Sequence, residues 1–192
     1  MKLLVLSGSP RPLSRTLVAA ALVGEMLRRR TGATPTVWDL AARPLPFANP
    51  DYHSEPAANP VPVVNRFVRE AMDADAFLLA SPVYHNSFSG VLKNALDTLS
   101  VEQLSHKPVG LIAFGGSLTA VQVCDQMRIV VRGLLGLAVP TQLVAVPSDF
   151  RADGDGPTRI SNPQLMRRAR RMADEIRMFA CAGRTTVDRS SA

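Results

Sequence analysis

A loop near the start of the chain carries hydroxyl groups and an arginine that could bind a phosphate. Residues 7–16 read Ser-Gly-Ser-Pro-Arg-Pro-Leu-Ser-Arg-Thr and join a short apolar run to an amphipathic stretch. A helix N-terminus presents free backbone N–H groups and a positive dipole end, which favour an anion. Ser9, Ser14 and Thr16 can donate hydroxyls, and Arg11 adds a charged fork of donors. A helix cap needs one hydroxyl, so this set favours a phosphate site over capping alone.

This loop matches neither of two common nucleotide-binding motifs. It contains no Gly-x-Gly-x-x-Gly and no Gly-Lys-Ser/Thr. The sequence therefore argues against a nucleoside triphosphatase.

Two later loops could contact a flat ring. Residues 81–90 read Ser-Pro-Val-Tyr-His-Asn-Ser-Phe-Ser-Gly, so backbone groups could meet the edge of a heterocycle with Tyr84 alongside. Gly115-Gly116-Ser117 allows the backbone to approach a ligand closely. Each loop has an ordinary structural reading, as a strand-to-helix connection or a tight turn. Their occurrence together is more informative than either alone.

The elements that position these loops alternate between strand and helix. Apolar runs predict five strands, at 3–6, 36–40, 76–81, 109–114 and 141–146. Helical spacing predicts helices at 15–30, 63–74, 89–100, 119–137 and 162–181. This alternation predicts an α/β three-layer sandwich, with a five-stranded parallel sheet between two helical layers. Ligands of such sheets bind at the carboxyl ends of the strands, where the three loops fall. A phosphate site beside ring-contacting loops fits FMN at the switch point of a 2-1-3-4-5 sheet.

Length and composition indicate one folded domain. The chain has 192 residues, of which 46% are hydrophobic and 20% charged, as in ordinary globular proteins. We expect a single domain over residues 1–182 and a disordered tail over 183–192. The composition excludes a disordered chain, a collagen-like repeat and a coiled coil.

The sequence points to a cytoplasmic protein with no membrane partner. The apolar run at the N-terminus is too short for a signal-peptide core, and no run reaches the roughly 18 residues of a membrane span. Cys124 and Cys181 lie far apart without metal-ligand spacing. We expect buried free thiols, a reducing compartment and no metal site.

One long segment cannot form regular structure. Residues 42–62 contain prolines at 44, 46, 50, 56, 60 and 62, which exclude a helix or a central strand. Two readings stay open: a solvated connector, and a lid or subunit contact.

At these residues the chain resembles the NADPH-dependent FMN reductase family of flavodoxin-like proteins, from Met1 to about Val146. The motifs that carry the resemblance are Gly8-Ser9-Pro10-Arg11-Pro12-Leu13-Ser14, Pro82-Val83-Tyr84, Ser89-Gly90-Val91-Leu92-Lys93-Asn94-Ala95-Leu96-Asp97 and Gly115-Gly116-Ser117. The resemblance implies that the FMN phosphate is bound by Ser9, Arg11, Ser14 and Thr16. It implies an isoalloxazine ring lined by Pro82, Val83, Tyr84 and His85, with its pyrimidine edge at Gly115, Gly116 and Ser117. It also implies a homodimer or homotetramer, with the 89–100 helix near the interface.

The implied reaction is hydride transfer from NADPH, or NADH, to the flavin, which needs no general base or nucleophile. Quinone- and azo-reducing relatives tend to have Glu-Tyr-Asn where this chain has Val83-Tyr84-His85. Reductase partners of monooxygenases tend to have Val-Tyr and a Ser-Gly that opens the next helix. The resemblance therefore favours a reductase that supplies reduced FMN to a monooxygenase, with FMN as a better acceptor than a quinone or azo dye. An FMN-bound quinone or azo reductase is the alternative.

The charge of the chain bears on two rival classes of function. The formal net charge of +6 could indicate a nucleic-acid partner. The arginines of the last helix lack interleaved aromatics and are interrupted by Asp174 and Glu175, so a solvated helix face is favoured and no nucleic-acid partner is expected. An electron-transfer flavodoxin is the other rival. Such proteins are typically acidic, whereas this basic chain suits the anionic NADPH.

Overall fold

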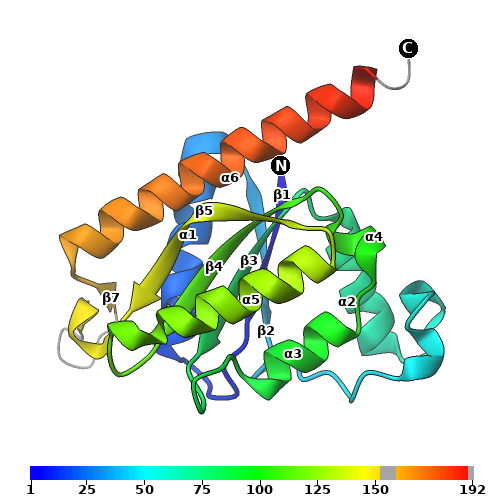
Figure 1. Ribbon diagram of the computed structural model, residues 1–192, viewed down its shortest axis with the longest axis horizontal. Helices are drawn as coiled ribbons and strands as arrows, with labels where there is room; N and C mark the ends of the chain where they lie inside the picture. Colours follow the sequence, from blue (N-terminus) through cyan, green and yellow to red (C-terminus); the bar gives the residue numbers. More distant parts are fainter. Residues whose placement is uncertain (152–158, 190–192) are drawn as a thin grey trace.

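The computed structural model describes residues 1–151 and 159–189, and side chains as far as Ala182. Its centre is a parallel sheet with the strand order β2-β1-β3-β4-β5 (Figure 1). The strands are β1 (Lys2–Ser7), β2 (Thr34–Asp39), β3 (Ala76–Pro82), β4 (Pro108–Phe114) and β5 (Leu137–Ala145). The predicted fold class and strand order are confirmed.

Helices cover both faces of the sheet. The helices are α1 (Arg15–Thr31), α2 (Pro62–Asp73), α3 (Gly90–Asp97), α4 (Val101–Leu104), α5 (Val121–Gly133) and α6 (Pro163–Arg189). One buried cluster joins α1 and α6 to the sheet, and a second joins α2, α3, α4 and α5 to its other face. Every residue of β3 is buried, as expected for a central strand with apolar side chains on both faces.

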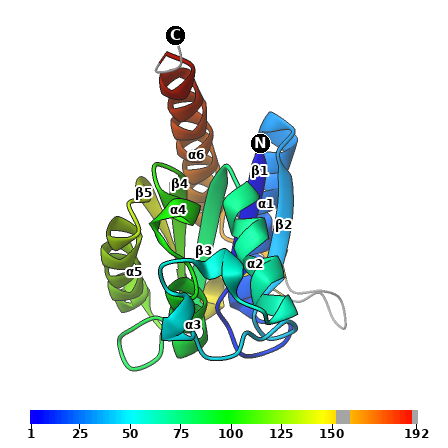
Figure 2. The same ribbon diagram turned by 90° about the vertical axis from the view of Figure 1, so that its right-hand side faces the viewer.

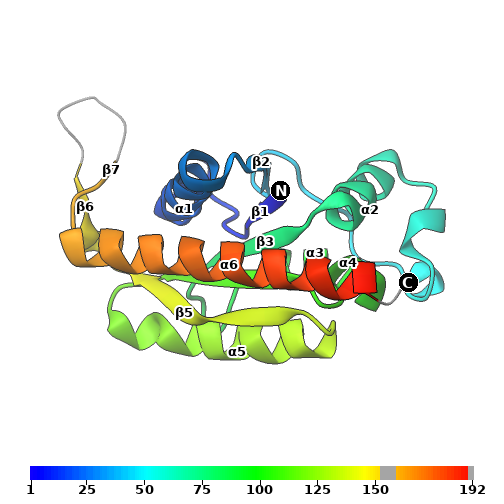
Figure 3. The ribbon, with the colours of Figure 1, turned by 90° about the horizontal axis from the view of Figure 1, so that it is seen from above.

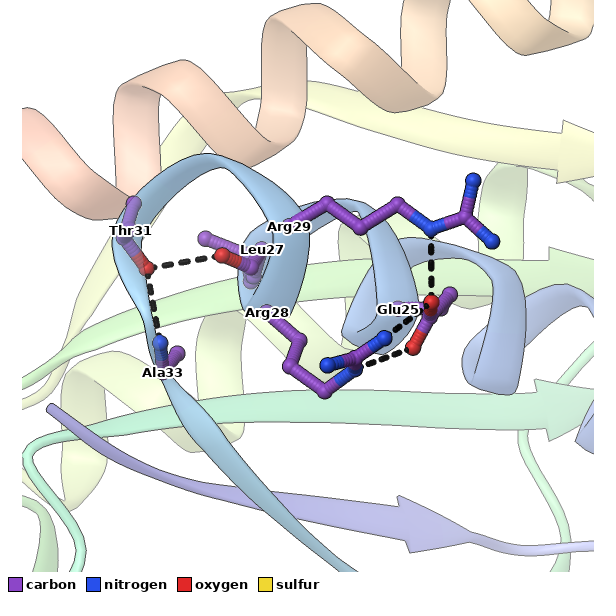
Figure 4. Close-up of polar contacts among 6 residues, drawn as sticks. All are labelled: Glu25, Leu27, Arg28, Arg29, Thr31 and Ala33. Atoms are coloured by element: carbon purple, nitrogen blue, oxygen red, sulfur yellow. Dashed lines mark hydrogen bonds and ion pairs between the residues drawn. The ribbon is translucent and has the colours of Figure 1, made fainter.

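The end of α1 shows how local sequence determines an element boundary. Gly32 adopts a left-handed conformation at the C-cap, and its N–H donates to the Arg28 carbonyl. Figure 4 shows the carboxylate of Glu25 between the guanidinium groups of Arg28 and Arg29, on the exposed side of this last turn. Cations at this end also suit the negative end of the helix dipole.

Several predicted boundaries were wrong. The helix predicted over 119–137 is a 3₁₀ turn, η3 (Leu118–Ala120), followed by α5, and β5 begins at Leu137 rather than at 141. Leu135 has a positive φ of 57° and reverses the chain there. The helix predicted to reach residue 100 ends at Asp97, because Ser100 starts α4 with its own capping box.

The region after β5 contains a hairpin that the sequence did not predict. A 3₁₀ turn, η4 (Pro147–Asp149), leads into β6 (Phe150–Arg151), which pairs antiparallel with β7 (Arg159–Ile160). The hairpin lies beside the first turn of α6 (Figure 3). The polar turn predicted at 151–157 lies, apart from Arg151, outside the described residues.

The last helix is longer than predicted. We expected it to end at Cys181, whereas α6 continues to Arg189 and enters the segment predicted to be a disordered tail. No proline follows Gly183, and a single glycine weakens a helix by only about 1 kcal/mol relative to alanine. Residues 190–192 of that tail lie outside the described residues.

The proline-rich segment is anchored to two helices. It forms two 3₁₀ turns, η1 (Pro50–Tyr52) and η2 (Pro56–Ala58), and lies between α2 and α3 (Figure 2). The Asn94 side chain on α3 donates to the Pro46 carbonyl at 2.8 Å and accepts from the Ala48 N–H at 2.9 Å. Asn65 on α2 donates to the Ala57 carbonyl at 2.8 Å. These contacts hold the segment against the domain.

The two cysteines differ in their surroundings. Cys124 is buried, and this burial raises its thiol pKa to about 12. Cys181 is exposed, so the expectation of two buried thiols was wrong for it; the helix that carries it turns that position outward. Over the described ranges, no helix is long and apolar enough to span a membrane. The same ranges hold no cluster of three or more His, Cys, Asp or Glu side chains that could bind a metal.

Candidate functional site

A cavity of about 390 Å³ lies at the carboxyl ends of β1, β3 and β4. It lies within the size range of small-molecule sites. Its lining residues are Ser9, Arg11, Ser14, Arg15, Thr16, Pro82, Val83, Tyr84, Phe114, Gly115, Gly116 and Pro147. The structure therefore brings together every predicted site residue except His85 and Ser117. Arg15, Phe114 and Pro147 were not predicted.

The first side of the cavity is the N-terminus of α1. The Ser14 hydroxyl accepts a hydrogen bond from the Leu17 N–H at 3.2 Å. Ser14 is therefore the N-cap of α1, as the alternative reading of this loop expected. The buried Ser9 hydroxyl accepts the Arg11 N–H at 3.1 Å and shapes the turn that carries Arg11. Thr16 is buried and also lines the cavity. A helix dipole and two arginines, Arg11 and Arg15, thus face this end of the cavity.

The loop after β1 is joined to the loop after β3 by close contacts at Gly8. A Cβ on Gly8 would lie 2.7 Å from the Leu92 Cβ and 2.9 Å from the Ala80 carbonyl oxygen. The Gly8 N–H donates to that same oxygen at 2.7 Å, and the Ser89 hydroxyl donates to the Gly8 carbonyl. Glycine is therefore needed at position 8 for this close approach of the two loops.

Ser81 and Ser89 form a buried polar link that sequence reasoning missed. The Ser81 hydroxyl accepts the Ser89 N–H at 2.9 Å and donates to the Pro82 carbonyl at 2.8 Å. The Ser89 hydroxyl caps α3 by accepting the Leu92 N–H at 3.2 Å. A serine before Gly90 at a helix start was a capping signal, but its contact with Gly8 required the tertiary structure.

A tight turn after β3 forms the second wall. Tyr84 and Ser87 exchange two backbone hydrogen bonds, at 2.9 and 3.0 Å, around His85 and Asn86. Tyr84 lines the cavity and is 39% exposed, so its aromatic side chain is open to a ligand. His85 lies at the tip of the turn, is exposed and does not line the cavity.

The loop after β4 forms the third wall. A Cβ on Gly115 would lie 2.6 Å from the Ala120 Cβ and 2.8 Å from Val83 Cγ1, so the backbone needs glycine there. A Cβ on Gly116 would meet nothing within 4 Å, which leaves its backbone open to a ligand. The Ser117 hydroxyl bonds to that of Thr119 at 2.6 Å, and Ser117 is exposed outside the cavity. The Val83 N–H donates to the Phe114 carbonyl at 2.8 Å and joins this wall to the second.

The donor set fits a flavin mononucleotide. The end at α1 offers hydroxyls, positive charge and a helix dipole, as a phosphate requires. At the other end, the exposed ring of Tyr84 could pack against the face of a planar ring, and the backbone of Gly116 could contact its edge. Of the residues that line this cavity, none is acidic, so anionic ligands meet no repulsion from its wall.

Comparisons with known proteins agree with this arrangement. Residues 1–151 match the family model of NADPH-dependent FMN reductases. An FMN-dependent NADPH-azoreductase of Staphylococcus aureus is 35% identical over 183 residues, which cover 93% of this chain and 95% of that protein.

Solved structures show the same fold. An oxidoreductase from Corynebacterium diphtheriae superimposes with a TM-score of 0.75 at 19% identity, over 94% of this chain and 97% of its own. A flavodoxin, WrbA-like protein from Agrobacterium tumefaciens superimposes with a TM-score of 0.63 at 16% identity, over 96% and 98% of the two chains. The fold is flavodoxin-like.

The family match covers all three walls of the cavity, from the phosphate-type loop at α1 to Pro147. The chain therefore belongs to the NADPH-dependent FMN reductase family, and it is an oxidoreductase that uses FMN and NADPH.

Proposed function

We propose that this protein holds FMN in the cavity between α1 and the Tyr84 turn and uses NADPH to reduce an aromatic acceptor, an azo compound or a quinone. The observation that carries the proposal is one continuous cavity with a phosphate-type end and an exposed tyrosine wall. The azoreductase relative, which matches nearly the whole chain, supports the choice of acceptor.

In this proposal the residues of the chain bind and orient, and they carry no proton-transfer role. Ser9, Arg11, Ser14 and Thr16 hold the phosphate, while Pro82, Val83 and Tyr84 border the ring. Gly115 and Gly116 bring backbone to the ring edge. Bound FMN supplies a group that accepts a hydride from NADPH and passes electrons to the acceptor. The open side at Tyr84 is where nicotinamide and acceptor would enter in turn.

The second candidate is a reductase that supplies reduced FMN to a partner monooxygenase. The observation that favours it is Val83 in the cavity wall, where the quinone- and azo-reducing branch tends to carry a glutamate. An apolar residue there offers the ring no charged anchor, so the flavin would exchange more readily.

Anaerobic steady-state oxidation of NADPH separates the two candidates. The acceptors are free FMN, menadione and an azo dye, each offered to protein loaded with FMN. A kcat/KM for the dye or quinone at least tenfold above that for FMN supports the first candidate. The reverse order supports the second candidate, a reductase that supplies reduced FMN. Co-purification with a monooxygenase would then support the partnership.

The proposal includes a homodimer or homotetramer with α3 and the proline-rich segment at the interface. A second cavity, of about 250 Å³, lies between them and is lined by Leu40, Pro44, Leu45, Pro46, Phe47, Gly90, Val91 and Asn94. Phe47 is 94% exposed and lines this cavity together with other apolar side chains, and contiguous exposed apolar surface is typical of protein–protein contacts. Light scattering of Phe47→Ser against the parent tests this: a shift to smaller mass supports the interface. We also place the protein in the cytoplasm, where NADPH is regenerated.

A further inference from the structure

The turn that carries Tyr84 has a backbone conformation that needs support. Its two central residues, His85 and Asn86, have positive φ angles of 48° and 63°. A two-residue hairpin turn with both central residues left-handed is of type I′, and such turns favour glycine. Neither central residue here is glycine, and left-handed backbone is costly for residues with a Cβ. Asn tolerates it better than most residues do.

Gln126 on α5 supports this turn from outside the cavity. Its amide Nε2 donates to the Asn86 carbonyl at 3.1 Å, and its Oε1 accepts from the Ser87 hydroxyl. The Asn86 carbonyl can only accept, so the two contacts agree on one orientation of the Gln126 amide. Gln126, about 40 positions further along the chain, thus forms hydrogen bonds with two consecutive residues of the turn.

The inner end of the same loop is held separately. The Val83 N–H donates to the Phe114 carbonyl at 2.8 Å, and Val83 packs closely against Gly115. Tyr84 therefore lies between two anchored points, one at β4 and one at α5. Since Tyr84 forms the exposed wall of the cavity, the position of its ring depends on both anchors.

We propose that Gln126 is a positioning residue that holds Tyr84 in the cavity wall and thereby sets how tightly the enzyme binds its aromatic acceptor. The assignment of an acceptor role rests on the proposed function. The geometric part, that Gln126 holds the turn, stands without it. Gln126 does not line the cavity, so it acts through the turn and not by contact with a ligand.

The first test measures the turn itself, in the whole chain without added flavin. Amide hydrogen exchange is followed at Tyr84 and Ser87, whose N–H groups close the turn. We expect Gln126→Ala to speed exchange at both amides about tenfold, the size expected for the loss of about one net hydrogen bond. Gln122→Ala, an exposed position on the same helix, is the matched control and should leave both amides unchanged.

A rescue variant distinguishes positioning from a general effect on α5. Glycine adopts positive φ without steric cost, so Asn86→Gly should hold the type I′ turn without help. We expect Asn86→Gly to restore slow exchange in the Gln126→Ala background. Damage to α5 would not be repaired by a change in the turn, so failure of this rescue would overturn the proposal.

The second test measures how the variant affects the KM for the acceptor. We expect Gln126→Ala to raise the KM for the azo dye or quinone about tenfold. The FMN dissociation constant, measured by flavin fluorescence, should rise by clearly less, because the α1 end of the cavity still holds the phosphate. A matching loss of FMN affinity would overturn the acceptor role. If Gln126→Ala folds poorly, Ser87→Ala removes one of the two contacts and should show the same two effects more weakly.

The outcomes separate this proposal from the proposed function. If the parent protein reduces none of the acceptors, the proposed function fails, while the exchange data still decide whether Gln126 holds the turn. Unchanged exchange in both Gln126→Ala and Ser87→Ala would overturn the proposal whatever the acceptor proves to be.

Discussion

Glu175 on α6 accepts two hydrogen bonds from Thr141 on β5, one from the backbone N–H and one from the hydroxyl, each at 2.7 Å. β5 is an edge strand of the sheet, and no strand among residues 1–151 and 159–189 pairs with its outer backbone groups. Arg128 donates to the carbonyls of Ala138 and Val139, at 3.3 and 3.2 Å, and Arg168 donates to that of Gln142, at 3.1 Å. Side chains thus cover polar groups that could otherwise pair with another chain.

We expect Glu175→Gln to lower the free energy of unfolding by about 1–2 kcal/mol at neutral pH, because hydrogen bonds to a charged acceptor contribute more than neutral ones. Burial raises the pKa of Glu175, but the bonds from Thr141 and Arg171 outweigh it and the net pKa is lowered. A lowered folded-state pKa means that this stability is present above the ordinary pKa of 4.5 and is lost as pH falls.

Urea unfolding of the parent and Glu175→Gln from pH 7 to pH 3 checks this, and Glu102→Gln on the short α4 serves as a surface control. A difference between parent and variant that stays constant down to pH 3 would contradict the role given to the Glu175 carboxylate.

Arg11→Ala should weaken FMN binding by an order of magnitude or more. Arg11 lines the phosphate-type end of the cavity, and a charge-assisted hydrogen bond contributes about 1.5–3 kcal/mol. Fluorescence titration with FMN measures the dissociation constant. Titration with riboflavin, which lacks the phosphate, is the control: its affinity should be the same for parent and variant. An unchanged FMN affinity would remove Arg11 from the site.

Gly8→Ala should destabilise the fold by about 1–3 kcal/mol, because the added methyl group would overlap the Leu92 Cβ and the Ala80 carbonyl. Gly90→Ala is a matched control at the start of α3, where a Cβ meets nothing within 4 Å and φ is not positive. Thermal unfolding should show a lower Tm for Gly8→Ala and no loss for Gly90→Ala. Equal Tm values for the two variants would refute the close approach at Gly8.

The carboxyl of Glu25 should titrate far below its usual range. Hydrogen bonds from Arg28 and Arg29 lower its pKa to about 2 (Figure 4). The stability that this cluster contributes is present above pH 4.5 and is lost as pH falls towards 2. NMR titration of the carboxyl carbon measures the pKa directly. In Arg28→Ala we expect the pKa to rise towards 4.5, and a value near 4.5 in the parent would show that the pair does not form in solution.

The sequence by itself determined the sheet, the family and most of the residues that line the cavity. The strands β1, β3 and β4 are short apolar runs followed by turn residues, and such local signals are readable without a structure. Parallel strands bring their carboxyl ends to one edge of the sheet, so the loops that follow β1 and β3 could be predicted to meet there. This is why Ser9, Arg11 and Tyr84 could be predicted to share a cavity.

Only the tertiary structure decided how the loops are held. The bonds from Ser89 to Gly8 and from Gln126 to the Tyr84 turn join residues about 40 to 80 positions apart, and no local pattern encodes such a pairing. His85 was predicted beside the ring, but its left-handed backbone in a type I′ turn places it at the exposed tip. Which side chains of a loop face the cavity depends on turn geometry and on contacts with distant helices, and both are properties of the folded chain.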